Sequence, residues 1–323
     1  MTPETMSNWG AAVRGVGVTF ADFFSQNKMA YTPSWEPVVK SETDDGAQAT
    51  FSGKTGSGVL SMFSEGSSIP RKNRYKLYDT AFVHKQYGGQ IEVTRLQLMN
   101  RMFADSFGEF KDLTISGNVL KSKAPAQIFN GAFATTTTVN SIRLTIYADG
   151  KPLASTIHPR VDGNTAQSNA SSTGIALSEP NFETGRVALL EQLQDDGTPI
   201  TVVGDIYLVV PTALEKTATI ITGSELRSGT ANNDVNIYSG GAYKVMASNW
   251  LGLAQGGSNT AWFLVAPSVS QLKLVNRTSG EMDQSVDSNT KSTLFDVVCD
   301  LSVGSADWHG VWGSKGDGAA YSS

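Results

Sequence analysis

Tyr207-Leu-Val-Val-Pro-Thr-Ala-Leu-Glu-Lys216 is the stretch of sequence that decides the fold. The apolar run from Ile206 to Val210 predicts a short buried strand, and Pro211 ends it because proline lacks the N–H that a sheet ladder needs. Thr212 and Glu215 have the spacing of a capping box, which predicts that a helix begins at once. A polar loop follows, Ser224-Glu-Leu-Arg-Ser-Gly-Thr-Ala-Asn-Asn-Asp-Val-Asn236. This block contains no catalytic pattern, so it predicts structure rather than chemistry.

The composition narrows the class of protein. A chain of 323 residues suggests two domains with ample buried core. The single cysteine, Cys299, predicts a reducing compartment, and the first residues lack the basic and apolar regions of a secretory signal. A net charge of −5 argues against a protein that grips nucleic acid through clustered cations. Residues 245–272 carry no charged side chain, but polar residues interrupt the run, which favours a soluble interior segment over a membrane span.

The N-terminal residues predict an arm. Apolar side chains recur at helical spacing over residues 6–25, ending with Phe20 and Phe23, yet three glycines weaken this helix. A short helix that cannot stand alone is ordered mainly by a partner, so we expect it to lie on another subunit. The alternative is an ordinary first helix packed on its own core.

The next segment predicts a projecting hairpin with a basic tip. Residues 44–70 are rich in Gly, Ser and Thr, with Met62 in a short apolar run, and residues 81–87 and 90–94 form two strand pieces around Gly88-Gly89. Four cations lie between these parts: Arg71, Lys72, Arg74 and Lys76. A projection that cannot bury both faces on its own domain needs a ligand or another chain to cover it.

Downstream, the periodicity alternates between helix and strand. Helical spacing over 96–110 and 113–133 predicts two helices in succession, the second broken by Gly117 and Pro125. Another helix is expected at 182–194. Alternation predicts half-buried strands at 142–148 and 295–303, and further strands are expected at 243–247, 261–266 and 271–277.

Motifs that suggest chemistry are weak. Gly53-Lys54-Thr55 ends like a phosphate-binding loop but lacks the glycine five positions earlier, and the three histidines lack the short spacing of a zinc site. Ser155, His158 and Asp162 could suggest a triad, but the polar loop offers no nucleophile elbow. Glycosylation sequons at Asn169 and Asn276 have no meaning in a cytoplasmic product. We expect no catalytic residue, cofactor or metal.

Several blocks of the sequence together resemble one known family. They are the 207–236 block, Tyr87-Gly-Gly-Gln-Ile-Glu-Val-Thr-Arg95, Gln127-Ile-Phe-Asn-Gly-Ala-Phe133, Ala148-Asp-Gly, Ser155-Thr-Ile-His-Pro159, Gln167-Ser-Asn169 and Leu301-Ser-Val-Gly-Ser-Ala-Asp-Trp-His-Gly-Val-Trp-Gly313. Over residues 69–315 the chain resembles the Mu-like major head subunit family of tailed bacteriophages, with its Hong Kong 97-type capsid fold.

That resemblance implies an α+β fold in four parts. They are an N-terminal arm (1–45), an extended loop built as a β-hairpin (46–93), a peripheral domain with a spine helix (94–151 and 271–305), and an axial domain (152–270 and 306–323). It also implies a non-enzymatic major capsid protein that self-assembles as pentamers and hexamers around double-stranded DNA, without sequence-specific binding. Phe20, Phe23, Met62, Arg71, Lys72, Arg74 and Lys76 are then the candidate subunit-interface residues.

The resemblance also implies partners and a location. The partners would be further copies of the chain, then a scaffold, a maturation protease, a portal and decoration proteins, with no membrane. The protein would assemble in the host cytoplasm and reside in the virion. Some members of this fold join subunits by an isopeptide bond, for which Lys54, Lys72, Lys76 or Lys85 and Asn276 or Asn289 are available. Alternatives are an encapsulin-like compartment shell and, from a different class, a surface binding module.

Overall fold

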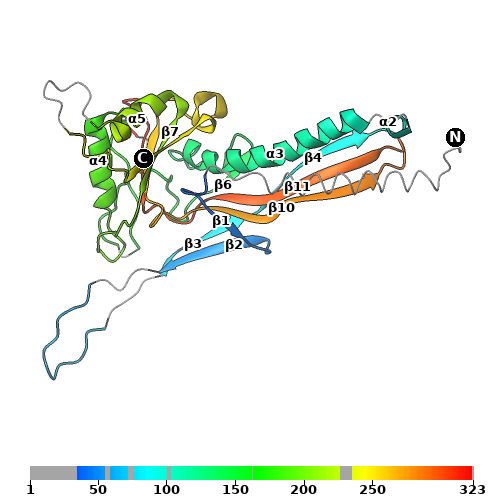
Figure 1. Ribbon diagram of the computed structural model, residues 1–323. Helices are drawn as coiled ribbons and strands as arrows, with labels where there is room; N and C mark the ends of the chain where they lie inside the picture. The colour runs from blue at the N-terminus through cyan, green and yellow to red at the C-terminus, as the bar shows by residue number, and fades with distance from the viewer. Residues whose placement is uncertain are drawn as a thin grey trace.

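The computed structural model describes residues 35–54, 59–71, 76–99, 103–161, 163–225 and 235–321. In these ranges the chain forms a compact lobe, an elongated lobe and a projecting hairpin (Figure 1). The predicted helix at 6–25, with Phe20 and Phe23, lies outside the described residues.

A long sheet forms the elongated lobe. Its strands run in the order β1-β10-β11-β6-β5, and β4 also pairs with β11. Their bounds are β1 Lys40–Thr43, β4 Lys85–Val93, β5 Thr138–Val139, β6 Ile142–Thr145, β10 Leu272–Val286 and β11 Thr293–Ser305. The predicted strand at 295–303 is confirmed, because Phe295, Val297 and Cys299 are buried while the residues between them are partly exposed. Strand β10 runs nine residues beyond the predicted end at 277, since it pairs with β11 along its full length.

One continuous helix covers one face of this sheet (Figure 1). The expected pair of helices is wrong: α3 runs from Phe103 to Asn130, with Pro125 inside it, and only the short α2, Arg95–Met99, precedes it. A proline inside a helix costs about 3 kcal/mol. Burial of the end of the helix around this proline offsets that cost, because Ala124, Ala126, Ile128 and Phe129 pack in the core shared by the two lobes.

Gly88 and Gly89 lie inside a strand, so the predicted break between two strand pieces is also wrong. Both glycines belong to β4 and pair with Val298 and Val297 of β11. A Cβ on Gly89 would lie 2.7 Å from a methyl carbon of Leu113 on α3. Gly89 therefore lets the helix approach the sheet closely, and both glycines continue the strand instead of forming a turn.

The compact lobe has its own four-stranded sheet, in the order β12-β9-β7-β8. Its elements are α4 Glu179–Leu190, β7 Ile206–Pro211, the 3₁₀ turn η1 Thr212–Leu214, α5 Glu215–Gly223, β8 Tyr243–Ser248, the 3₁₀ turns η2 Asn249–Leu251 and η3 Leu253–Gln255, β9 Trp262–Val265 and β12 Val311–Ser314. The order of strand, stop and helix at 206–223 is confirmed. The predicted capping box is wrong, because η1 begins first and neither η1 nor α5 has a side-chain cap. A reciprocal capping box joins Thr94 and Gln97 instead, at the start of α2.

A shared core joins the two lobes. It combines residues at the C-terminal end of α3, such as Phe129, with Val209 and Phe263 of the compact lobe and Leu301 and Val303 of β11. A second core lies within the compact lobe between α4, α5 and the sheet. Among the described residues, no helix is long and apolar enough to cross a membrane.

Candidate subunit interface

The projecting hairpin is anchored at its base. It consists of β2, Gln48–Lys54, and β3, Lys76–Val83, which pair antiparallel with Gln48 opposite Val83. The ring of Phe82 is fully buried and packs edge-on against Phe51, with centroids 5.1 Å apart. The ammonium of Lys273 on β10 lies 3.7 Å from the centroid of the Phe51 ring. The base is therefore part of the folded body, which fixes the direction in which the hairpin leaves it.

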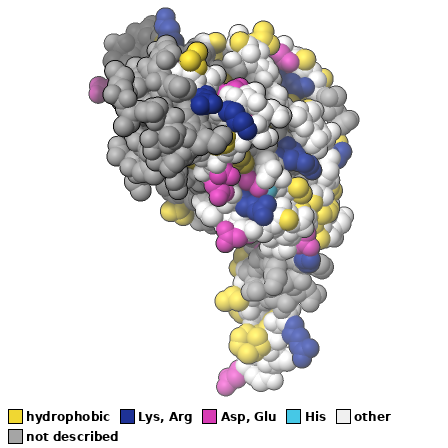
Figure 2. Space-filling model, turned by 90° about the vertical axis from the view of Figure 1, so that its right-hand side faces the viewer, with side chains coloured by type: hydrophobic (Ala, Val, Ile, Leu, Met, Phe, Trp, Pro, Cys, Tyr) yellow, Lys and Arg dark blue, Asp and Glu magenta, His cyan; other side chains and the backbone are white. Residues whose placement is uncertain are grey.

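Beyond the base, the hairpin carries apolar side chains that are largely exposed. Leu60 is 87% exposed, Met62 98% and Phe63 53%, and Val59 and Ile69 are each 75% exposed. Figure 2 shows hydrophobic side chains along the narrow projection, away from the body. Such a concentration of exposed apolar area on a protruding segment is typical of a contact surface for another molecule. These five side chains are called the apolar tip below.

The structure places three of the predicted interface residues on this hairpin. Met62 belongs to the apolar tip, and Arg71 and Lys76 lie exposed on the returning chain. Lys76 forms an ion pair with Asp79, which also accepts a hydrogen bond from Ser52. Lys72 and Arg74 lie outside the described residues, as do Phe20 and Phe23. Leu60, Phe63 and Ile69 were not among the predicted interface residues, although apolar residues in a stretch rich in Gly and Ser were a signal for them.

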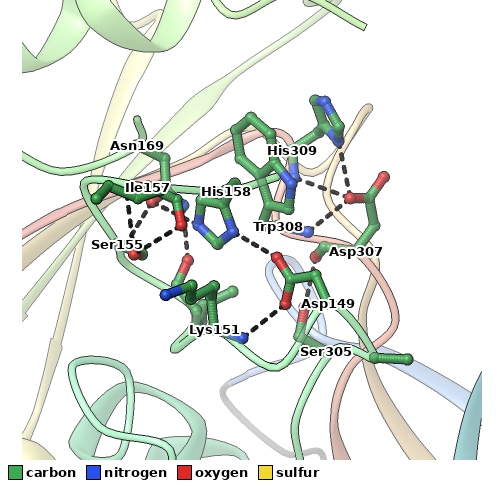
Figure 3. A network of polar contacts seen from close by, with 12 residues as sticks. Asp149, Lys151, Ser155, Ile157, His158, Asn169, Ser305, Asp307, Trp308 and His309 are labelled. Atoms are coloured by element: carbon green, nitrogen blue, oxygen red, sulfur yellow. Dashed lines mark hydrogen bonds and ion pairs between the residues drawn. The ribbon is translucent and has the colours of Figure 1, made fainter. Parts of the chain in front are cut away.

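A buried polar cluster occupies the junction of the lobes (Figure 3). The two ring nitrogens of His158 face Asp149 Oδ2 at 2.7 Å and Asn169 Oδ1 at 3.1 Å. Asn169 is oriented by donating to the Leu153 carbonyl and accepting from the Ser155 N–H. The His158 ring also stacks on Trp308, with centroids 4.4 Å apart. This cluster therefore ties the 149–169 loop to the strand connection at 305–311 through hydrogen bonds that burial strengthens.

His309 closes the other side of the same cluster. Its Nδ1 lies 2.8 Å from Asp307 Oδ1 and its Nε2 lies 3.1 Å from the Leu193 carbonyl. Burial lowers the pKa of His309, but the hydrogen bond to Asp307 and the charges of Asp307 and Asp195 outweigh it and raise the pKa above its usual value. Both ring nitrogens face acceptors, so the imidazolium form satisfies the site fully.

We expect His309 to stabilise the fold in a pH-dependent way. A histidine with a raised pKa contributes stability that is fully present below its unfolded pKa, about 6.5, and is lost as pH rises through the folded pKa. His309→Gln should therefore lower the melting temperature more at about pH 5.5 than at about pH 9. Thermal melts of both proteins across that range check this. Asp307→Asn should remove most of this pH dependence. A loss of melting temperature in His309→Gln that is the same at every pH would contradict the stabilising role of the His309 imidazolium.

The arrangement of side chains does not favour catalysis or modification. The Ser155 hydroxyl donates to the Ile157 carbonyl, and His158 faces Asp149 rather than this serine, so no triad forms; Asp162 lies outside the described residues. Asn169 is fully buried, which rules out its sequon as an acceptor. Within the described ranges, no group of three or more His, Cys, Asp or Glu side chains could hold a metal.

Comparisons with known proteins agree with this geometry. A family model described as phage capsid protein matches residues 78–313. A search of curated proteins finds no match. Among solved structures, a bacteriophage JBD30 capsid decorated with minor capsid protein trimers is similar with a TM-score of 0.52 and 13% identity, over 69% of this chain and 92% of that chain.

Two further structures are similar at lower scores. A second structure of the JBD30 capsid has a TM-score of 0.47 and 7% identity. The match covers 88% of this chain and 65% of the JBD30 chain. The capsid of Ralstonia phage GP4 has a TM-score of 0.49 and 11% identity, over 86% of this chain and 87% of that chain.

The fold is thus the Hong Kong 97-type α+β capsid fold, which defines a structural rather than an enzymatic protein. Because the family model covers well over half of its length, the chain belongs to the phage capsid protein family.

Proposed function

We propose that this protein is the subunit from which a tailed bacteriophage builds its icosahedral head, with identical copies associating as pentamers and hexamers around double-stranded DNA. The observation that carries this proposal is the apolar tip, because a capsid-family chain presents it on a hairpin whose base is rigidly anchored. Within this proposal, the resemblance of the sequence blocks described above favours the Mu-like subset of the family.

In the proposed shell, the hairpin and the N-terminal arm act as clamps. Each apolar tip covers its exposed side chains by lying on a neighbouring copy, and Phe20 and Phe23 of the arm do the same. Many individually modest contacts suit a closed shell, because strong single contacts would trap assembly errors. The outer edges of the hairpin strands also offer backbone N–H and C=O groups that a strand of a neighbouring copy pairs with in this arrangement.

A domain division is part of this proposal. The compact lobe corresponds to an axial domain, 152–270 and 306–323, which would surround the symmetry axis of each pentamer or hexamer. The elongated lobe corresponds to a peripheral domain, 94–151 and 271–305, with α3 as its spine helix. Strand β1 pairs with β10, and β4 with β11, so the ends of the arm (1–45) and of the extended loop (46–93) are built into the peripheral sheet.

The proposed partners follow from the shell. They are further copies of this chain, with a scaffold, a maturation protease, a portal and decoration proteins as additional components during assembly in the host cytoplasm. The net charge of −5 suits a wall that encloses a polyanion without holding it. An encapsulin-like shell would use the same contacts around a protein cargo, but the phage capsid family match favours the virion.

The mass of the purified protein tests the proposal. We expect light scattering to give particles of megadalton mass and uniform diameter, or rings of five and six subunits, in negative-stain images. A scaffold or protease from the same source is added if the chain alone stays small. A species that remains near the monomer mass of 34.4 kDa with every assembly factor present would contradict the proposal and favour the surface binding module.

A further inference from the structure

A cavity of about 340 Å³ lies between the base of the hairpin and the body of the chain. Figure 1 shows β2 and β3 leaving the body below β1 and β10. Small-molecule sites have volumes of about 300–1,000 Å³, and a cavity of about 150 Å³ already holds benzene, so an aromatic ring with a polar substituent fits here. The cavity is lined by residues 51–53 and 77–78 of the hairpin and by Tyr147, Gln271, Lys273, Ala306 and Asp307 of the body.

Aromatic rings form much of this lining. Tyr78 and Tyr147 meet edge to face, with ring centroids 5.6 Å apart, and Phe51 contributes a third ring. Among the described residues, neither tyrosine hydroxyl has a hydrogen-bond partner. A largely apolar cavity with a few polar groups is the usual form of a site for a small molecule.

The charged groups of the lining leave one carboxylate oxygen available. Lys273 is compensated, because its ammonium lies 2.6 Å from Glu42 Oε1. Asp307 Oδ1 accepts from the backbone N–H groups of Trp308 and His309 and lies 2.8 Å from His309 Nδ1. Among the described residues, Asp307 Oδ2 has no hydrogen-bond partner. This oxygen can therefore accept a hydrogen bond from a bound molecule.

The electrostatic potential at the body wall is also negative. Tyr147 is buried, which raises its pKa, and the charges of Asp307, Asp195 and Asp149 raise that pKa further. Tyr147 therefore stays a neutral hydroxyl. Carboxylates that disfavour a tyrosinate favour a positively charged group in the same place.

We propose that this cavity binds a small organic cation, an amidinium or guanidinium group carried on an apolar frame. The planar cation donates to Asp307 Oδ2, and its frame packs against the aromatic rings, because carboxylates and aromatic faces both attract such groups. An occupant contacts the hairpin and the body at once, so it ties the base of the hairpin to the body. The site uses residues of a single chain and does not depend on the proposed shell function.

Benzamidine is the probe for this site. Titration calorimetry on the full-length, unassembled chain should show saturable binding of one benzamidine per chain. Benzamide has nearly the same shape without the charge, so it should bind at least about tenfold more weakly, because it gives Asp307 no charged partner. Absence of saturable benzamidine binding, or equal affinities for the two compounds, would overturn the inference.

Variants of the cavity lining locate the binding. Asp307→Asn should weaken benzamidine binding at least about tenfold by removing the charge, and Ala306→Leu should block it by filling the cavity. Asp317→Asn is the matched control, because this exposed carboxylate lies off the cavity. Thermal melts first show that each protein is folded at the temperature used. If both cavity variants bind benzamidine as the wild type does, the site lies elsewhere and the inference fails.

The pH dependence of binding tests the role of Asp307 separately. Below the raised pKa of His309, its imidazolium compensates Asp307, so the affinity for benzamidine should rise at least about threefold between about pH 5.5 and pH 8.5. The other titratable or charged groups around this pair are Tyr78, Tyr147, Asp149, His158, Arg160, Asp195, Lys273 and Glu42. His309→Gln should bind benzamidine equally well across this range. A rise that persists in His309→Gln, or no rise in the wild type, would overturn the pairing of the cation with Asp307.

Discussion

Replacing Leu60, Met62 and Phe63 together by serine is expected to abolish shell formation while leaving the folded chain intact. All three side chains are largely exposed, so their loss removes little buried area from the single chain. In a shell they are the apolar anchors of the hairpin, and anchors in the centre of a contact cost about 2 kcal/mol or more each when truncated. The checks are particle yield on a density gradient and the melting temperature of the unassembled protein.

A conservative variant controls for this experiment. Leu60→Met, Met62→Leu and Phe63→Leu together keep the apolar area and should retain most of the particles. Deleting residues 46–70 would be less informative, because it removes β2 itself, including Phe51, which packs on the buried Phe82. If the serine variant forms normal shells, the tip is not an anchor. A fall in melting temperature that matches the loss of particles would place the tip in the core of its own chain.

Trp312→Ala is expected to have the largest effect on the stability of the chain. Trp312 is 2% exposed and packs against Trp262, with ring centroids 4.9 Å apart. Truncating a buried tryptophan costs about 3–5 kcal/mol, because apolar area is lost and the remaining cavity collapses only partly. Urea titrations of the unassembled protein measure this cost. A decrease in the free energy of unfolding of less than about 1 kcal/mol would show that the packing of Trp262 against Trp312 does not hold the compact lobe together.

Gly185 provides a reciprocal test of that packing. A Cβ at Gly185 of α4 would lie 2.8 Å from a ring carbon of Trp312, so Gly185→Ala should destabilise the wild-type chain by about 1–3 kcal/mol. In the Trp312→Ala background the same change meets a cavity and should cost much less, which makes the two effects non-additive. Gly223→Ala is the control: a Cβ there meets only Thr219, at 3.8 Å, so it should be neutral or slightly stabilising.

Much of the fold could be predicted from local sequence. The alternation at 295–303 predicted β11, and the apolar run ending at Pro211 predicted β7 and the helix after it. Both sequence patterns are local, because each reflects which side chains of a single strand are buried. Elements that depend on their neighbours were predicted less well: Pro125 does not break α3, and Gly88 and Gly89 do not break β4, because packing between helix and sheet overrides local preference.

The candidate interface was also predicted only in part from local sequence. Clustered cations at 71–76 and an apolar Met62 in a polar stretch predicted a contact surface on this hairpin from the sequence. The grouping of Glu92, Asp283 and Asp296 could not be predicted in that way. These residues lie on three strands that are distant in sequence, and only the register of β4, β11 and β10 places them side by side.

The sequence by itself therefore determined the order of strand and helix at 206–223, the absence of a recognisable catalytic motif, and the resemblance to phage head subunits. These depend on residue type and short-range spacing. Only the tertiary structure decided that His158, Trp308 and His309 meet in one buried cluster, and that the apolar tip stands clear of the body. The contact between His158 and Trp308, which are 150 residues apart in the sequence, arises from the cooperative packing of the whole chain, which no local pattern records.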